Sequence, residues 1–166
     1  MGMKHGILVA SLLILTLVVA PAGAFSADGL LILVDEDGDA DITFDYTLSW
    51  IERIAVFFKI AEPEQELKSA LEEASGAPVT VTSAKSNVAE FSVLGFAKVQ
   101  NTDDGVVYST PALDLTGAQA MLDRYWFAPL VQADFSPKKA VVRFPDGHEE
   151  TFSSQSTIPA LTHTIP

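Results

Sequence analysis

The sequence predicts an α+β domain in which three helices pack on one face of a largely antiparallel sheet of six or seven strands. Runs with the two-residue period of strands lie near both ends of the chain after residue 24, and a further group lies in its middle. Three segments between these runs carry the 3.6-residue period of helices. The connections are short and rich in Asp, Gly and Pro, which favours hairpins between neighbouring strands.

Residues 1–24 have the three parts of a secretory signal peptide. Lys4 lies in a short basic start, an apolar run extends from Ile7 to Ala20, and Ala22-Gly23-Ala24 gives a small-x-small ending. We expect cleavage after Ala24, and a single secreted domain formed by residues 25–166. The alternative is that residues 1–24 are not cleaved and anchor the protein. Only in that case do we expect the protein to be attached to a membrane. Against that alternative, the apolar run has about 14 residues, whereas a bilayer span takes roughly 20.

The composition excludes several classes of function. The chain has no cysteine, so thiol redox catalysis, disulfide bonds and lipidation of a cysteine are excluded. Its formal net charge is −12 at pH 7, and Lys138-Lys139 is its only adjacent pair of basic residues. Because binding to nucleic acid needs clustered Lys and Arg, we expect no nucleic-acid partner.

The first predicted hairpin joins residues 30–34 to residues 42–48 across the acidic stretch Asp35–Asp41. The even-numbered side chains of its second strand are apolar, which is typical of a strand with one solvated side. The next segment, Ser49–Ala61, is apolar around nearly its whole helical wheel and opens with a capping-box pattern. We expect this segment to be the innermost of the three helices.

The second predicted helix begins at Pro63, a residue favoured at the first helical position, and runs to Ser75. Gly76 ends it, because glycine readily adopts the left-handed conformation that closes many helices. A single apolar stripe is expected to cover the sheet, formed by Leu67, Ala70, Leu71 and Ala74.

Three strands are predicted after Pro78, at residues 79–82, 88–99 and 106–109, joined as a meander by polar turns. Gly95 lies inside the second of these runs. A glycine within a strand indicates a bulge or a close approach of another backbone.

The third predicted helix begins with the capping-box pattern at Thr116 and continues to Phe127, before Pro129 interrupts it. Residues 139–144 and 149–152 form a last predicted hairpin. The tail, residues 157–166, keeps several apolar side chains, so we expect it to pack along the sheet.

The acidic stretch is the one run that could hold a metal, because alternate carboxylates on a tight turn supply the oxygen ligands that calcium prefers. The candidate ligands are Asp35, Asp37, Asp39 and Asp41. The stretch does not match an EF-hand, since Ala40 and Tyr46 stand where that loop needs glycine and glutamate. We therefore interpret it as a charged hairpin turn. Calcium stays as the alternative, and no other cofactor is predicted.

Two histidines, His148 and His163, remain after residue 24. His148 lies among carboxylates and could act as a general base or as one ligand of a zinc site. The sequence around it lacks the second histidine of the helical metalloprotease motif, so we interpret it as an exposed turn residue. Whether His163 joins it across 15 residues of chain stays open at this point.

No catalytic residue is assigned from the sequence. The serines nearest to His148 in the chain, Ser153, Ser154 and Ser156, lie in no Gly-x-Ser-x-Gly turn, so a catalytic triad is unsupported. The aromatic run Tyr125-Trp126-Phe127 could form a platform for a ligand, but its helical spacing favours core packing.

Three short pieces together resemble a group of known proteins. They are Trp126-Phe127-Ala128-Pro129-Leu130, Phe144-Pro145-Asp146-Gly147 and Ile158-Pro159-Ala160-Leu161-Thr162-His163. The mature chain resembles small exported proteins of methanogenic archaea that have no assigned activity. The resemblance implies an archaeal cell-surface setting and carries over no catalytic residue.

For function, we expect a non-enzymatic extracytoplasmic domain associated with the cell envelope, a binding or interaction module whose ligand and partner are unknown. The alternatives are a cysteine-free secreted hydrolase that uses carboxylates, and a surface protein that binds calcium weakly. A concave site where two carboxylates, or His148 and a carboxylate, converge over apolar walls would favour the hydrolase. A pocket lined only by aromatic residues would favour binding.

Overall fold

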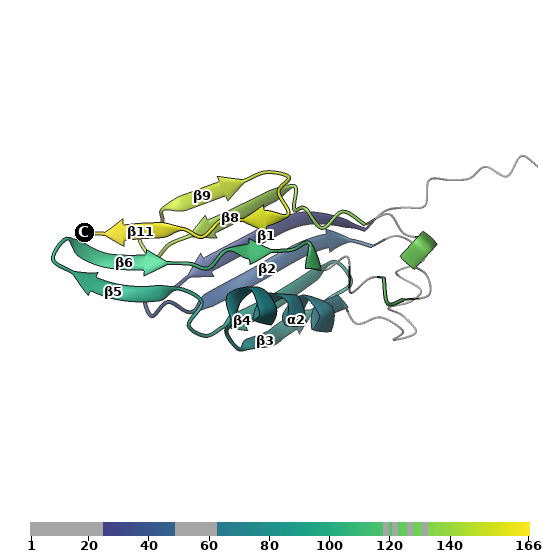
Figure 1. Ribbon diagram of the computed structural model, residues 1–166, viewed down its shortest axis with the longest axis horizontal. Helices are drawn as coiled ribbons and strands as arrows, with labels where there is room; N and C mark the ends of the chain where they lie inside the picture. Colours follow the sequence, from purple (N-terminus) through teal and green to yellow (C-terminus); the bar gives the residue numbers. More distant parts are fainter. Residues whose placement is uncertain (1–24, 49–62, 118–119, 121–122, 126–127, 131–132) are drawn as a thin grey trace, which may run out of the picture.

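The computed structural model describes residues 25–48, 63–117, 120, 123–125, 128–130 and 133–166. Its largest sheet has six strands in the order β3-β4-β2-β1-β8-β9. These strands are β1 (Ser26–Val34), β2 (Ala40–Thr47), β3 (Val79–Ala84), β4 (Val88–Val93), β8 (Lys139–Arg143) and β9 (Glu149–Phe152). The described part of the chain is mostly β (Figure 1).

Two smaller sheets complete the strand arrangement. A three-stranded sheet has the order β11-β6-β5, and β7 pairs with β10. Their members are β5 (Lys98–Thr102), β6 (Gly105–Ser109), β7 (Leu113–Asp114), β10 (Thr157–Ile158) and β11 (Thr162–Ile165). The C-terminal tail, residues 157–166, therefore contributes one strand to each of the two small sheets.

The predicted arrangement of three helices over a single sheet is wrong. One α-helix is described over its whole length, α2 (Pro63–Ser75), together with the short 3-10 helix η1 (Ala128–Leu130), and the described strands divide among three sheets. The segment predicted as the third helix is described only in part: Gly117 and Ala120 are helical, whereas residues 123–125 form a turn. The predicted signal peptide, residues 1–24, and the predicted central helix, Ser49–Ala61, lie outside the described residues.

The predicted meander is wrong because residues 88–99 do not form one strand. The chain turns at Leu94 and Gly95, where Gly95 has φ of 66° and Leu94 is 59% exposed. β4 stays in the large sheet between β2 and β3, whereas β5 leaves it to pair with β6. The glycine thus marks a turn between two sheets and not a bulge within one strand.

The first hairpin and the second helix agree with the prediction. β1 and β2 pair antiparallel from Ser26 with Thr47 to Val34 with Ala40, and the even-numbered side chains from Ile42 to Leu48 are buried. α2 has the predicted ends, and the Gly76 N–H donates to the Glu72 carbonyl with φ of 66° at Gly76. The local signals were sufficient here because each element is specified by its own turn or cap.

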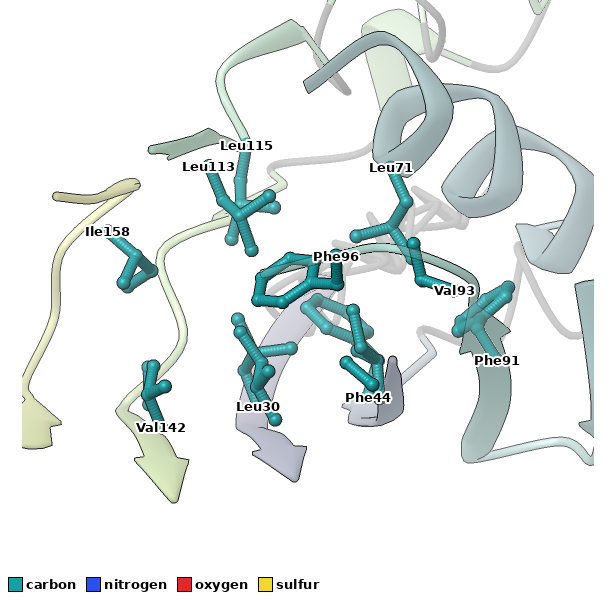
Figure 2. Packing of buried hydrophobic residues seen from close by; sticks show 14 of the residues in the cluster. Leu30, Phe44, Leu71, Phe91, Val93, Phe96, Leu113, Leu115, Val142 and Ile158 are labelled. Atoms are coloured by element: carbon teal, nitrogen blue, oxygen red, sulfur yellow. The ribbon is translucent and has the colours of Figure 1, made fainter. Parts of the chain in front are cut away.

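One continuous core joins the helix and all three sheets. Figure 2 shows Leu71 of α2 above the sheet residues Phe44 and Phe91, with Phe96 packed beside Leu113 and Leu115. Ile158 of the tail and Val142 of β8 extend the same cluster. At the first described residue, the Phe25 ring lies 4.9 Å from Phe135. The described residues contain no helix of the length and apolarity that a membrane crossing requires.

Candidate functional site

Two loops meet at one end of the large sheet because β1 and β8 are neighbours and parallel, with Gly29 opposite Lys139 and Leu33 opposite Arg143. The loop that follows β1 carries the acidic stretch Asp35–Asp41, and the turn that follows β8 leads to His148. Since parallel strands finish at the same edge of a sheet, their following loops lie side by side. We call the two segments, residues 35–41 and 144–150, the acidic end.

Tyr108 on β6 connects both segments of the acidic end. Its hydroxyl donates to the Glu36 carbonyl at 3.1 Å, and its ring meets the Phe144 ring edge-on at 6.5 Å between centroids. Burial raises the pKa of Tyr108, and the charges of Glu36, Asp35, Asp37 and Asp146 raise it further. The phenol therefore stays protonated and keeps donating its hydrogen bond at neutral pH.

The acidic stretch is held by its own carboxylates. Asp35 Oδ1 accepts hydrogen bonds from the Asp37 N–H at 3.0 Å and the Asp39 N–H at 2.9 Å. Asp39 Oδ1 accepts from the Gly95 N–H at 2.7 Å, which ties the stretch to the turn after β4. Two of the four candidate calcium ligands thus serve as acceptors for backbone groups.

No cluster of three or more metal-ligating side chains in the part of the chain that the structure describes is arranged to hold a metal ion. The four candidate ligands lie on one loop, with Asp41 at the exposed start of β2. The charged-turn interpretation of Asp35, Asp37, Asp39 and Asp41 stays a prediction, and calcium binding stays its alternative.

The structure brings His148 and His163 together. Their rings are stacked, with 4.3 Å between centroids and 8° between planes. His163 Nε2 lies 2.8 Å from Asp146 Oδ2, and His148 Nε2 lies 3.2 Å from Glu150 Oε1. The Phe144 ring lies beside both imidazole rings, 4.8 Å from His163 and 6.0 Å from His148 between centroids. We call these five residues the histidine clasp.

The clasp joins two sheets. Phe144, Asp146, His148 and Glu150 belong to the β8–β9 hairpin of the large sheet, whereas His163 lies on β11, opposite Tyr108 of β6. The hydrogen bond to His163 is the main reason that the pKa of Asp146 is lower than usual, and the His148 backbone N–H, 3.0 Å from Asp146 Oδ1, adds to it. Asp146 therefore stays ionised well into acid solution.

A histidine held by a carboxylate is half of a catalytic constellation, but the described serines that follow His148 in the sequence do not reach it. β9 runs antiparallel to β8, so it carries the chain away from His148 by about 13 Å over its four residues. The Ser154 N–H accordingly bonds to the Pro137 carbonyl, beside the start of β8. The serines near His148 in sequence thus lie at the opposite end of the hairpin, which agrees with the absence of a triad motif.

A hollow lies beneath α2. Its walls come from β1, β2, β4 and α2, with Leu115 and Phe135 completing them. Every described side chain that lines it is aliphatic or aromatic, so it brings together no groups for acid–base chemistry. Of the predicted aromatic platform, Tyr125 is half-buried, while Trp126 and Phe127 lie outside the described residues.

The sequence indicated the acidic stretch and both histidines but not the role of Tyr108 or the pairing of Asp146 with His163. The alternation in Thr162-His163-Thr164-Ile165 is a strand signal that could have placed His163 in a sheet. The strand that pairs with it lies more than 50 residues away in the sequence, and no local sequence pattern identifies that strand. Comparison of the chain with protein-family models, with curated proteins and with solved structures finds no match.

Proposed function

We propose that this chain is a non-enzymatic extracytoplasmic domain, a binding module associated with the cell envelope, and that the acidic end is its contact surface. One observation carries the proposal. Among the described residues, both histidines are partly exposed and bond to neighbouring carboxylates, while the hollow beneath α2 has only apolar described walls. An open polar surface suits contact with a macromolecule better than turnover of a small substrate.

The charge of the acidic end favours a cationic partner. The two segments carry eight carboxylates, five in residues 35–41 and three in residues 144–150. Arg143 pairs with Glu149 at 2.6 Å and offsets one of them. A surface of one sign attracts the opposite sign and speeds association, in a manner that salt screens.

The binding test uses purified residues 25–166 and a surface coated with a lysine-rich peptide, with a glycine-serine peptide as the neutral comparison. We expect retention on the lysine surface that falls as salt rises from 50 to 500 mM. The double change Asp37→Asn with Asp41→Asn should weaken retention. The matched control, Asp45→Asn with Glu73→Gln, removes the same charge from exposed positions elsewhere and should weaken it less. Equal weakening by both pairs would refute the acidic end as the contact surface.

The export part of the proposal has a separate test. The basic start, the apolar run and the ending Ala22-Gly23-Ala24 predict that exported protein begins at Phe25. N-terminal sequencing of protein recovered from outside the cell measures this directly. Material that keeps Met1 and sediments with membranes would favour the retained anchor.

The hydrolase alternative is tested on the same protein. Turnover of ester, peptide or glycoside substrates that disappears in His148→Gln or Asp146→Asn would overturn the non-enzymatic assignment. A trace of activity that both variants retain would indicate a contaminating enzyme.

A further inference from the structure

We propose that the histidine clasp is a one-proton switch that controls how firmly the C-terminal strand β11 is held. The clasp holds β11 most firmly when the stacked pair carries a single added proton, and less firmly with none or with two. The proposal concerns the conformation of this chain and does not depend on what the acidic end binds.

The side-chain geometry makes the clasp a link between sheets. Among the described strands, β11 lies at the edge of its sheet and pairs with β6 only. His163 adds two contacts across the sheet junction, one with Asp146 at 2.8 Å and one with the ring of His148 at 4.3 Å between centroids. Whatever strengthens or weakens these contacts therefore changes how easily β11 detaches.

A first proton strengthens the link. A proton on His163 makes its bond to Asp146 charge-assisted, and this is the bond that crosses from β11 to the β8–β9 hairpin. His148 and Glu150 both belong to that hairpin, so their bond does not itself hold β11. While His148 stays neutral, the stack is not opposed by like charges.

A second proton opposes the link. Two imidazolium rings at 4.3 Å between centroids repel each other across a stack that has no room for a screening water between them. The gain from the second ion pair is small because the four side chains are between 20% and 47% exposed. Two groups that interact this closely take up their protons in two separate steps.

The surrounding negative charges favour uptake of the first proton, but they do not cancel the repulsion that opposes the second. From the hairpin, Asp146 and Glu150 face the two rings, whereas the Glu149–Arg143 pair lies on the other face of the hairpin by strand alternation. From the acidic loop, Asp35, Glu36 and Asp37 lie near Tyr108 of β6, which stays neutral in this range. This negative field attracts a proton to the pair, whereas the repulsion between the two rings acts only once both are charged.

The experiment follows the Cε1–H resonances of both histidines by NMR from pH 8 to pH 4.5, together with hydrogen exchange of the β11 amides. Protection factors are expressed relative to β5, the other edge strand of the same sheet. We expect the two rings to take up their protons in two separate steps. Protection of β11 should pass through a maximum between these steps, about two- to fivefold above its values at the two ends of the range.

His148→Phe separates charge from stacking, because phenylalanine keeps an aromatic ring beside His163 and cannot take a proton. In this variant His163 should titrate in one step, and β11 protection should rise to a plateau in acid without the later fall. Asp45→Asn, a change elsewhere on the large sheet, should leave the wild-type profile intact. A single-step titration in the wild type, or a maximum that survives in His148→Phe, would overturn the proposal.

Discussion

Gly38 and Gly147 offer a paired test of how tightly the acidic loop is packed. Both residues have φ of 87°, and both N–H groups close a turn, Gly38 onto the Asp35 carbonyl and Gly147 onto the Phe144 carbonyl. They differ in their surroundings. A Cβ at Gly38 would lie 2.4 Å from the Ala97 carbonyl oxygen and 2.7 Å from a Val99 methyl, whereas a Cβ at Gly147 would meet nothing within 4 Å.

The magnitudes follow from that difference. An alanine at positive φ costs about 1–2 kcal/mol, part of which is offset because alanine restricts the unfolded chain. Gly147→Ala should therefore cost about 0.5–1.5 kcal/mol. Gly38→Ala adds overpacking of about 1–3 kcal/mol and disturbs the 2.7 Å bond from the Ala97 N–H to the Gly38 carbonyl, so we expect a loss of about 2–4 kcal/mol.

Urea denaturation of residues 25–166 at pH 7 measures both free energies of unfolding, with the midpoint shift interpreted only if the slope is unchanged. Gly76→Ala serves as a further comparison, since its φ is 66° and its surroundings are open. Equal losses at Gly38 and Gly147 would show that the contact with the Ala97 backbone is not made, and would refute the tight packing of the acidic loop.

Three other predictions concern the core, the pH dependence of stability and calcium. Phe91→Ala should cost about 3–5 kcal/mol because the side chain is 1% exposed, whereas Leu94→Ala should cost less than about 0.5 kcal/mol; thermal and urea unfolding compare them. The hydrogen bonds from Lys138 and Thr47 lower the pKa of Asp28, so its stabilising contribution is present above its unfolded pKa of about 3.9 and is lost as pH falls through the folded value. Asp28→Asn should accordingly lose less stability than the wild type between pH 5 and pH 2. Millimolar calcium should raise the melting temperature no more than magnesium at matched ionic strength, and a calcium-specific rise abolished by Asp37→Asn with Asp39→Asn would establish a site.

Elements specified by neighbouring residues could be predicted from the sequence. The hairpin of β1 and β2 has period-two alternation on each side of an Asp-Gly turn, and α2 has Pro63 at its start and Gly76 at its end. In residues 35–41 the structure shows Asp35 accepting from the loop backbone and Asp39 accepting from the Gly95 N–H, while the choice between a charged turn and a calcium site stays a prediction.

Features that depend on distant residues could not be predicted. Residues 88–99 have an apolar run that hides the turn at Leu94 and Gly95, since a buried strand on each side of a turn has the same composition as one longer strand. The parallel pairing of β1 with β8 leaves no local signal, and the histidine clasp depends on it. His163 reaches His148 only because β11 pairs with β6 in one register, which places His163 opposite Tyr108.

The pairing of β1 with β8 also bears on the order in which the chain can fold. Asp28 and Lys138, which bond at the start of the two strands, are 110 residues apart in sequence. β1 and β2 can form a hairpin early, but the other edge of β1 stays open until β8 has been synthesised. Contacts of such long range slow folding, because the entropy of closing the loop is lost before the contact forms. We therefore expect refolding in milliseconds to seconds, with the open edge of β1 as the place where an incomplete chain would pair with another copy.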